Sequence, residues 1–165
     1  MENGLQVQVV GGGIAGLAAA LACSQSGANV HLCEQAAAIK EVGAGLQISP
    51  NGLAVLSRLG LKDAVADIAD RAEAVELRDY KDGKLVCRLD LKAHASDLDF
   101  LLVHRADLIQ TLFQACKAQG VRFAFSQSLS SQDLLSGAFG SEAAASPVDL
   151  VIGADGVRSN MRTAL

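Results

Sequence analysis

The longest uncharged stretch of the chain, residues 3–33, contains three consecutive glycines, and this combination constrains the fold more than any other feature. Leu5 to Val10 is an apolar β-type run, and Ile14 to Ser26 is rich in Ala and Leu and stops at Gly27, as helices often do. Asn29 to Cys33 predicts a second short strand. The order strand, glycine turn, helix, strand within roughly 30 residues predicts a parallel, buried βαβ unit.

Uncharged segments of this length also occur in signal peptides and membrane spans. Here the chain starts with the acidic Met1-Glu2-Asn3, where a signal peptide would be basic. Polar residues, namely Gln6, Gln8 and Ser24 to Ser26, also interrupt the apolar run. We therefore expect no membrane partner and, with no targeting motif at either end, a cytoplasmic location.

Charge and cysteine content exclude two further classes of protein. The 18 acidic residues outnumber the 14 basic ones, the basic residues are scattered, and one Tyr and five Phe offer few stacking platforms. We therefore expect no nucleic-acid partner. The spacing of Cys23, Cys33, Cys87 and Cys116 fits neither a CxxC redox pair nor a zinc site, so we expect buried, reduced thiols and no metal.

The rest of the chain predicts further elements around a β-hairpin. Asp82-Gly83 lies between two runs of period two, which is a hairpin signal. We expect helices at 50–60, 62–68 and 106–119, and strands at 100–103, 121–125 and 148–153. Residues 42–47 are expected to be a loop, most of 126–147 a loop or a poorly ordered hairpin, and 157–164 a last amphipathic turn.

The glycines after the first predicted strand carry the clearest functional signal. Gly11, Gly13 and Gly16 fit G-x-G-x-x-G, which permits a tight turn, close approach of the backbone to a pyrophosphate, and packing of helix on strand. The phosphates would lie at the helix N-terminus. Glu34, at the end of the second strand, would accept hydrogen bonds from ribose hydroxyls and repel a 2'-phosphate. The alternative is a purely structural turn, and the motif alone does not separate NAD, NADP and FAD.

Four segments together resemble a known family: VGGGIAG from Val10, EVGAGLQISPNGLAVLSRLGL from Glu41, HRADLIQTL from His104 and DLVIGADGVRSNMR from Asp149. In these the sequence resembles the FAD-dependent aromatic hydroxylases typified by p-hydroxybenzoate and salicylate hydroxylases. The resemblance implies an α/β fold, a Rossmann-like FAD-binding domain of the glutathione-reductase type, over residues 1–165. It assigns about 73–103, with the antiparallel hairpin, to the start of the substrate-domain sheet. Family members are more than twice as long, so the chain resembles their amino-terminal part, with the carboxyl-terminal part absent.

The resemblance also implies which residues hold the adenosine diphosphate half of FAD. The backbone at the glycine turn and the acid after the second strand take this role in the family. On this chain these positions are Gly11, Gly13, Ala15, Gly16, Glu34 and the adjacent Gln35. The segment around Leu129 is where the family's backbone passes the adenine.

Other family positions map to the flavin end of the cofactor. Gly45, Leu46 and Gln47 correspond to the loop near the isoalloxazine edge, with a plain connector as the alternative. Arg105 resembles the residue that reaches the FAD phosphate and ribityl region, where the fixed fork of a guanidinium suits phosphate. The alternative is a surface arginine. Asp155 matches an Asp-Gly motif linked to FAD and to the reduced pyridine nucleotide, with simple helix capping as the alternative.

By this resemblance the chain is the FAD-binding portion of a monooxygenase that uses NADH or NADPH to hydroxylate an aromatic small molecule. The residues name no catalytic acid or base. Because oxygen transfer from a flavin needs a closed site, we expect this chain alone to hydroxylate nothing measurable. Apolar surface uncovered by truncation predicts self-association. The alternatives are another FAD-dependent oxidoreductase of the same fold and a non-catalytic nucleotide-binding module.

Overall fold

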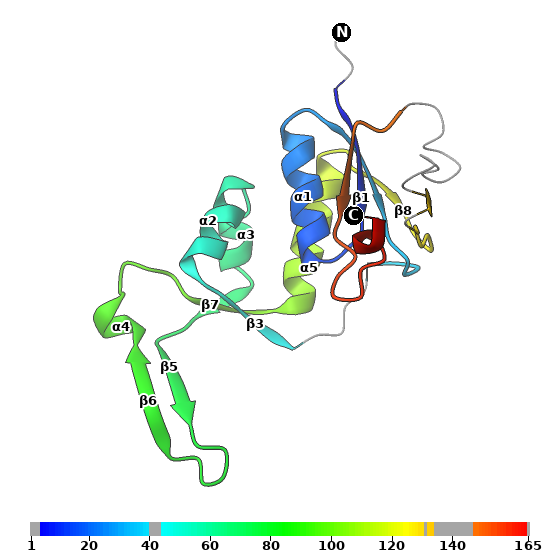
Figure 1. Ribbon diagram of the computed structural model, residues 1–165. Helices are drawn as coiled ribbons and strands as arrows, with labels where there is room; N and C mark the ends of the chain where they lie inside the picture. The colour runs from blue at the N-terminus through cyan, green and yellow to red at the C-terminus, as the bar shows by residue number, and fades with distance from the viewer. Residues whose placement is uncertain (1–3, 40–43, 131, 134–146, 165) are drawn as a thin grey trace. The chain divides into compact units, whose positions relative to one another are not determined.

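The computed structural model describes residues 4–39, 44–130, 132–133 and 147–164 (Figure 1). The chain divides into two compact units. Unit 1 comprises residues 1–41 and 109–165, and unit 2 comprises residues 42–108. Unit 1 contains a four-stranded sheet, and unit 2 contains a three-stranded sheet and a two-stranded hairpin.

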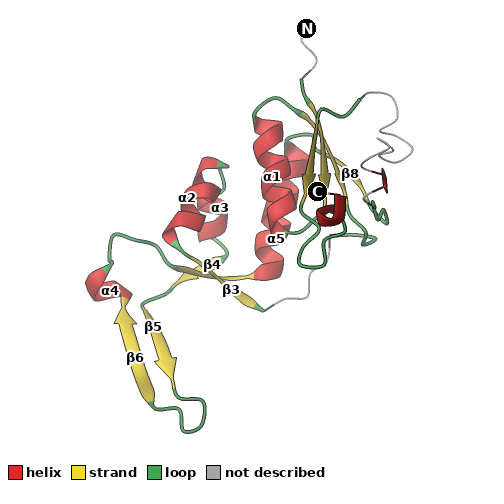
Figure 2. Cartoon of the chain, viewed as in Figure 1, coloured by secondary structure: helices red, strands yellow, loops and turns green. Residues whose placement is uncertain are grey.

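Unit 1 is built on a parallel sheet of the predicted kind. Its strands are β1 (Gln6–Val10), β2 (Asn29–Cys33), β8 (Arg122–Ala124) and β9 (Leu150–Gly153), in the order β8-β2-β1-β9. All three pairings are parallel, and α1 (Ile14–Gln25) connects β1 to β2 (Figure 2). The βαβ unit expected from the uncharged segment is therefore confirmed.

Side-chain alternation places the apolar residues of β1 and β2 on both faces of this sheet. Val7 and Val9 pair with Val30 and Leu32, and all four are buried. The next residues along each strand point to the opposite face. There Val10 and Cys33 pack with Leu129 and Met161. A strand buried on both faces explains why β1 and β2 carry no charged residue.

α1 lies beside a second long helix, whose residues 109–118 also belong to unit 1 (Figure 1). The thiol of Cys116, on α5 (Arg105–Ala118), donates to the carbonyl of Leu17 on α1 at 3.2 Å. Both side chains are fully buried, and burial raises the pKa of Cys116 to about 11. The ring of Phe113 meets that of Phe123 edge to face, with centroids 4.9 Å apart. These contacts attach α5 to both α1 and β8.

Unit 2 contains an antiparallel sheet that the sequence only partly predicts. Its strands are β3 (Gly45–Ile48), β7 (Leu101–His104) and β4 (Ala69–Arg71), in the order β3-β7-β4. The prediction of a loop at 42–47 was wrong for 45–47, and positions 42 and 43 lie outside the described residues. β4 was not predicted. β3 and β4 are short, and each pairs with β7, which is distant in sequence. Local sequence patterns therefore carry little signal for these two strands.

Helices α2 (Pro50–Arg58) and α3 (Lys62–Ala66) of unit 2 follow the predicted pattern. Pro50 occupies the first turn of α2, where its missing N–H costs nothing. Leu53, Leu56 and Val65 are buried. Both helices end two residues earlier than expected, a typical error at helix ends.

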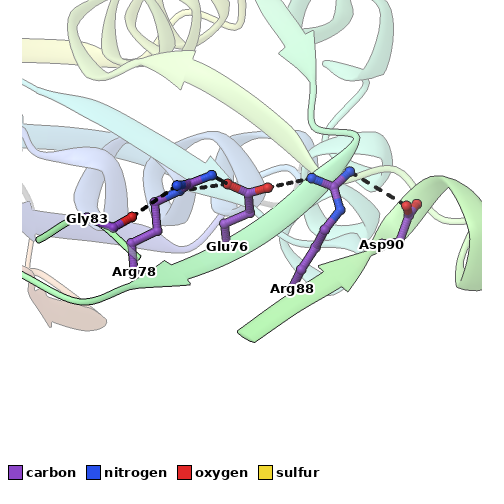
Figure 3. A network of polar contacts seen from close by, with 5 residues as sticks. All are labelled: Glu76, Arg78, Gly83, Arg88 and Asp90. Atoms are coloured by element: carbon purple, nitrogen blue, oxygen red, sulfur yellow. Dashed lines mark hydrogen bonds and ion pairs between the residues drawn. The ribbon is translucent and has the colours of Figure 1, made fainter. Parts of the chain in front are cut away.

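The predicted hairpin is formed by β5 (Ala74–Arg78) and β6 (Leu85–Asp90), with Gly83 in the left-handed conformation at the turn. One side carries a polar network in which Glu76 binds Arg78 and Arg88, and Arg88 reaches Asp90 (Figure 3). These contacts hold the pKa of Glu76 below its usual range, first through its hydrogen bond with Arg78.

The other side of the hairpin is apolar and exposed. Cross-strand pairs place Val75 opposite Leu89 and Leu77 opposite Cys87. The exposed fractions of Val75, Leu77 and Leu89 are 41%, 63% and 51%. The expectation that all four cysteines are buried was therefore wrong for Cys87, which is exposed, and for Cys23, which is half-buried. Pairing with Leu77 places Cys87 on the exposed apolar side of the hairpin, and the cysteine spacing used for the prediction carries no information on this pairing.

Three further segments are a short helix after the hairpin, the last turn of the chain and the segment at 126–147. The short helix α4 (Leu91–His94) was not predicted, and Asp90 caps it by accepting from Ala93 N at 3.0 Å. The last turn is the 3-10 helix η1 (Met161–Ala164). Most of the predicted loop at 126–147 lies outside the described residues. Within the described part of the chain, no helix is long and apolar enough to cross a membrane.

Candidate functional site

The glycine turn between β1 and α1 is tightly packed at two of its glycines. Gly11 has φ +107°, and a β-carbon there would lie under 3.0 Å from the carbonyl of Ala154. A β-carbon on Gly16 would lie under 3.0 Å from the carbonyl of Gly11. Both neighbours are backbone atoms, so neither position accommodates a larger residue without movement of the chain. The turn is thus held between the start of α1 and the end of β9.

Gly13 differs from the other two, because a β-carbon there would meet nothing within 4 Å. It is the N-cap of α1, with extended backbone (φ −75°, ψ −177°), and no side chain caps the helix. The first turn of α1 contains no acidic residue, and Ala15 in that turn is exposed. The first N–H groups of a helix lack intrahelical acceptors, so this end of α1 favours an anion.

Glu34 follows β2 and reaches back to the glycine turn. Its Oε2 accepts from the backbone N of Gly12 at 2.6 Å, and its Oε1 accepts from the backbone N of Ala36 at 2.8 Å. Each carboxylate oxygen has a second lone pair for a further donor. The carboxylate therefore lies beside the helix N-terminus, as the sequence predicts.

Gly12 is a site residue that the sequence reasoning missed. A β-carbon at this position would be 3.0 Å from Glu34 Oε2 and 2.6 Å from Ile39 Cδ1. A side chain there would push the carboxylate away. The run of three glycines was the available signal, because the G-x-G-x-x-G pattern accounts for only two of them.

Asp155 lies next to the first glycine but uses its carboxylate locally. Its Oδ2 accepts from the backbone N of Asn160 at 2.7 Å and of Met161 at 3.1 Å. Burial opposes ionisation, but the hydrogen bonds, first that from Ser159, outweigh it and lower the pKa of Asp155. The structure thus shows the capping contact that was the alternative interpretation of Asp155.

Leu129 and Gln35 occupy different environments within unit 1. Leu129 is buried and packs with Met161 and with Val10 and Cys33. Val10 and Cys33 are the last residues of β1 and β2, directly before the glycine turn and Glu34. Gln35 is exposed in the turn after β2. Unit 1 therefore brings together the eight predicted residues on its own segments, namely Gly11, Gly13, Ala15, Gly16, Glu34, Gln35, Leu129 and Asp155.

The remaining predicted residues belong to unit 2 and also meet each other. Gly45 pairs with His104 across β3 and β7, and the backbone N of Arg105 donates to the carbonyl of Ala44 at 3.4 Å. The Nε of Arg105 is buried, Leu46 is half-buried and Gln47 is exposed. Strand pairing thus places the glycine segment beside the start of α5.

Comparison with known sequences decides the family. The profile of the family described as "FAD binding domain" matches residues 4–165. The chain belongs to this FAD-binding domain family. The glycine turn and Glu34 thus lie in a domain whose family binds FAD, and NAD and NADP are no longer equal candidates for this turn.

Two relatives with similar sequences are monooxygenases. The 3-amino-4-hydroxybenzoate 2-monooxygenase of Streptomyces cremeus is 36% identical over 98% of this chain and 42% of the relative. The 6-hydroxynicotinate 3-monooxygenase of Pseudomonas fluorescens is 30% identical over 100% of this chain and 44% of the relative. The chain therefore spans about two fifths of the length of these relatives.

A solved structure of an oxygenase is also similar to this chain over about two fifths of its own length. The tetrameric form of 2-methyl-3-hydroxypyridine-5-carboxylic acid oxygenase superposes with a TM-score of 0.79 at 28% identity. The match covers 98% of this chain and 42% of that one. The predicted α/β FAD-binding fold is confirmed by this match and by the family.

Proposed function

We propose that this chain is the FAD-binding portion of a monooxygenase that takes electrons from NADH or NADPH and hydroxylates an aromatic small molecule. The observation that carries the proposal is the glycine turn, with an uncapped helix N-terminus on one side and the Glu34 carboxylate on the other. The two relatives named above are monooxygenases of ring compounds, which favours oxygen transfer over another flavoprotein reaction or a non-catalytic module. A cytoplasmic location stays a prediction from the sequence.

The residues present in unit 1 fit the adenosine diphosphate half of FAD. A pyrophosphate needs backbone N–H donors and open space, and Gly13 at the start of α1 offers both. A ribose diol needs an acceptor, and Glu34 has free lone pairs beside the same turn. We assign the pyrophosphate to the turn of Gly11, Gly13, Ala15 and Gly16, and the ribose to Glu34 with Gln35 alongside.

We also propose roles for the other predicted residues, each within its own unit. We assign the adenine to the segment at Leu129, which is buried beside the end of β2. Gly45, Leu46, Gln47 and Arg105 are proposed to contact the flavin side, with Arg105 as the cation for a phosphate. Asp155 is proposed to act by fixing the turn after β9. We also propose that residues about 73–103 begin the substrate domain.

When bound, FAD supplies the electron transfer and oxygen chemistry that amino-acid side chains lack. This chain's residues then have two tasks, to bind the cofactor and to orient it. Glu34 holds the ribose end through charge-assisted hydrogen bonds. The dipole of α1 stabilises the phosphate charge.

Replacing Glu34 by Ala tests the proposed function. We expect the wild-type chain to bind FAD saturably and in preference to FMN and NAD. Loss of hydrogen bonds to a charged group costs about 1.5–3 kcal/mol, so the variant should bind FAD about tenfold to a hundredfold more weakly. FMN lacks the adenosine ribose, so its affinity should not change. Flavin fluorescence during titration measures both ligands.

The matched control is Glu73→Ala, which removes an exposed carboxylate of unit 2 that pairs only loosely with Lys92 at 3.7 Å. It should bind FAD like the wild-type chain. If the wild-type chain prefers NAD, or if Glu34→Ala binds FAD with unchanged affinity, the assignment of the ribose site is wrong.

We also propose that the chain self-associates. One solved relative is described as tetrameric, and the apolar side of the β5–β6 hairpin exposes Val75, Leu77 and Leu89. Exposed apolar clusters commonly mark interaction surfaces. Size-exclusion chromatography with light scattering at rising concentration should show a growing mass, and Leu77→Lys should reduce it. A constant monomer mass at every concentration would contradict this proposal.

A further inference from the structure

A polar network of four side chains joins β1, the end of β2 directly before Glu34, and the segment after β8. Gln8 on β1 donates through Nε2 to Cys33 Sγ at 3.1 Å, and its Oε1 lies 3.1 Å from Nδ1 of His31. The thiol of Cys33 in turn donates to Oε1 of Gln127 at 3.4 Å. Gln8 and Cys33 are each 1% exposed. Buried polar groups are costly unless partnered, so this network restricts the conformations of its members.

Gln127 connects this network to the backbone of Glu34. Its backbone N donates to the carbonyl of Glu34 at 3.0 Å, while its side chain accepts from the neighbouring Cys33. The residue before it, Ser126, donates from its backbone N to the carbonyl of Ala36 at 3.0 Å. Ser126 and Gln127 therefore hold the chain at Cys33, Glu34 and Ala36.

The turn at Ser126 is strained. Ser126 has φ +57°, the only positive value among the described non-glycine residues. Such a conformation costs free energy and persists where the surroundings enforce it. Here the enforcing contacts are the hydrogen bonds of Ser126 and Gln127 to the segment around Glu34.

We propose that Gln127 is a positioning residue, which holds Glu34 in the conformation that receives the ribose of FAD. Its amide oxygen accepts from the buried thiol of Cys33, and this contact fixes the 126–127 turn against the end of β2. With the turn fixed, the backbone of Glu34 stays in place and its carboxylate reaches Gly12 and Ala36. The ligand part of this inference rests on the proposed function, whereas the link from Gln127 to Glu34 does not.

Gln127→Leu tests the link in the chain without FAD. Leucine keeps the approximate size of the side chain but cannot accept from Cys33. Amide hydrogen exchange measured by NMR should become about tenfold faster at Gly12 and Ala36, the two donors to the Glu34 carboxylate. The amide of Ala154, which donates to Val10 at 2.7 Å across the β1–β9 pairing, should keep its rate. Unchanged exchange at Gly12 and Ala36 would overturn the proposal.

Gln114→Leu is the matched control, because Gln114 is exposed on α5 and has no part in the network. It should leave exchange at Gly12 and Ala36 unchanged. If it accelerates them equally, the effect is general loss of stability and the proposal fails.

A titration then separates positioning from FAD binding itself. Gln127→Leu should weaken FAD about tenfold and leave FMN unchanged, because only FAD has the adenosine half. If the wild-type chain does not bind FAD, the proposed function fails, while the exchange data still decide the link between Gln127 and Glu34. Equal losses for FAD and FMN would contradict a role at the ribose end.

Discussion

Replacing Gly13 by Asp is expected to stabilise the fold and at the same time to abolish FAD binding. The backbone at Gly13 already has the extended conformation of an N-cap, and a new side chain there has open space. Asp accepts from the first N–H groups of a helix and interacts well with its dipole. We expect a gain of a few tenths to about 1 kcal/mol in the free energy of unfolding.

The same carboxylate would compete with the pyrophosphate for these N–H groups. Two unit charges about 4 Å apart repel by about 4 kcal/mol at an effective dielectric of about 20. FAD affinity should therefore fall more than a hundredfold. Urea unfolding and flavin titration measure the two effects, whose opposite signs exclude misfolding as the cause.

Gly13→Asn is the control for charge, because Asn also caps helices but is neutral. It should bind FAD more tightly than Gly13→Asp, with the difference shrinking as salt screens the repulsion. Equal affinities of the two variants would show that the phosphates do not lie at this end of α1.

Replacing Gly16 by Ala is expected to destabilise unit 1 severely, although Ala favours helices over Gly by about 1 kcal/mol. The new β-carbon would lie under 3.0 Å from the carbonyl of Gly11. This oxygen belongs to a turn whose other side packs on Ala154, so it has no room to yield. Overpacking of this kind costs about 1–3 kcal/mol or more, and the steric cost outweighs the helix propensity. We expect a loss of at least about 2 kcal/mol in urea unfolding.

Gly13→Ala provides the comparison, because it makes the same chemical change three residues away without a close contact. Its stability should change by less than about 1 kcal/mol. If Gly16→Ala is as stable as the wild-type chain, α1 does not pack closely on the glycine turn.

Much of unit 1 could be predicted because its signals are local. The uncharged residues 3–33 contain both strand patterns, the helix and the glycine turn, and the predicted strand Asn29 to Cys33 matches β2 at both ends. A strand buried on both faces excludes charge, and this restriction is visible in the sequence itself. The resemblance to the flavoprotein family then extended the prediction to the cofactor.

Unit 2 was harder to predict, because its short strands depend on partners distant in sequence. β3 and β4 both pair with β7, and the second pairing joins residues 69–71 to 101–103. Their segments lack the length and alternation that identify a strand. The exposure of Cys87 likewise follows from the cross-strand register of the hairpin.

The sequence by itself determined the βαβ unit, the G-x-G-x-x-G turn and the acid after the second strand, because period, glycine and charge are properties of neighbouring residues. Only the tertiary structure decided how these parts are held. It showed Gly12 donating to Glu34, Asp155 capping the last turn, and Gln127 joined to Cys33 across 94 positions of sequence. Such contacts depend on which strands become neighbours, and that is settled by burial of the whole sheet rather than by any local pattern.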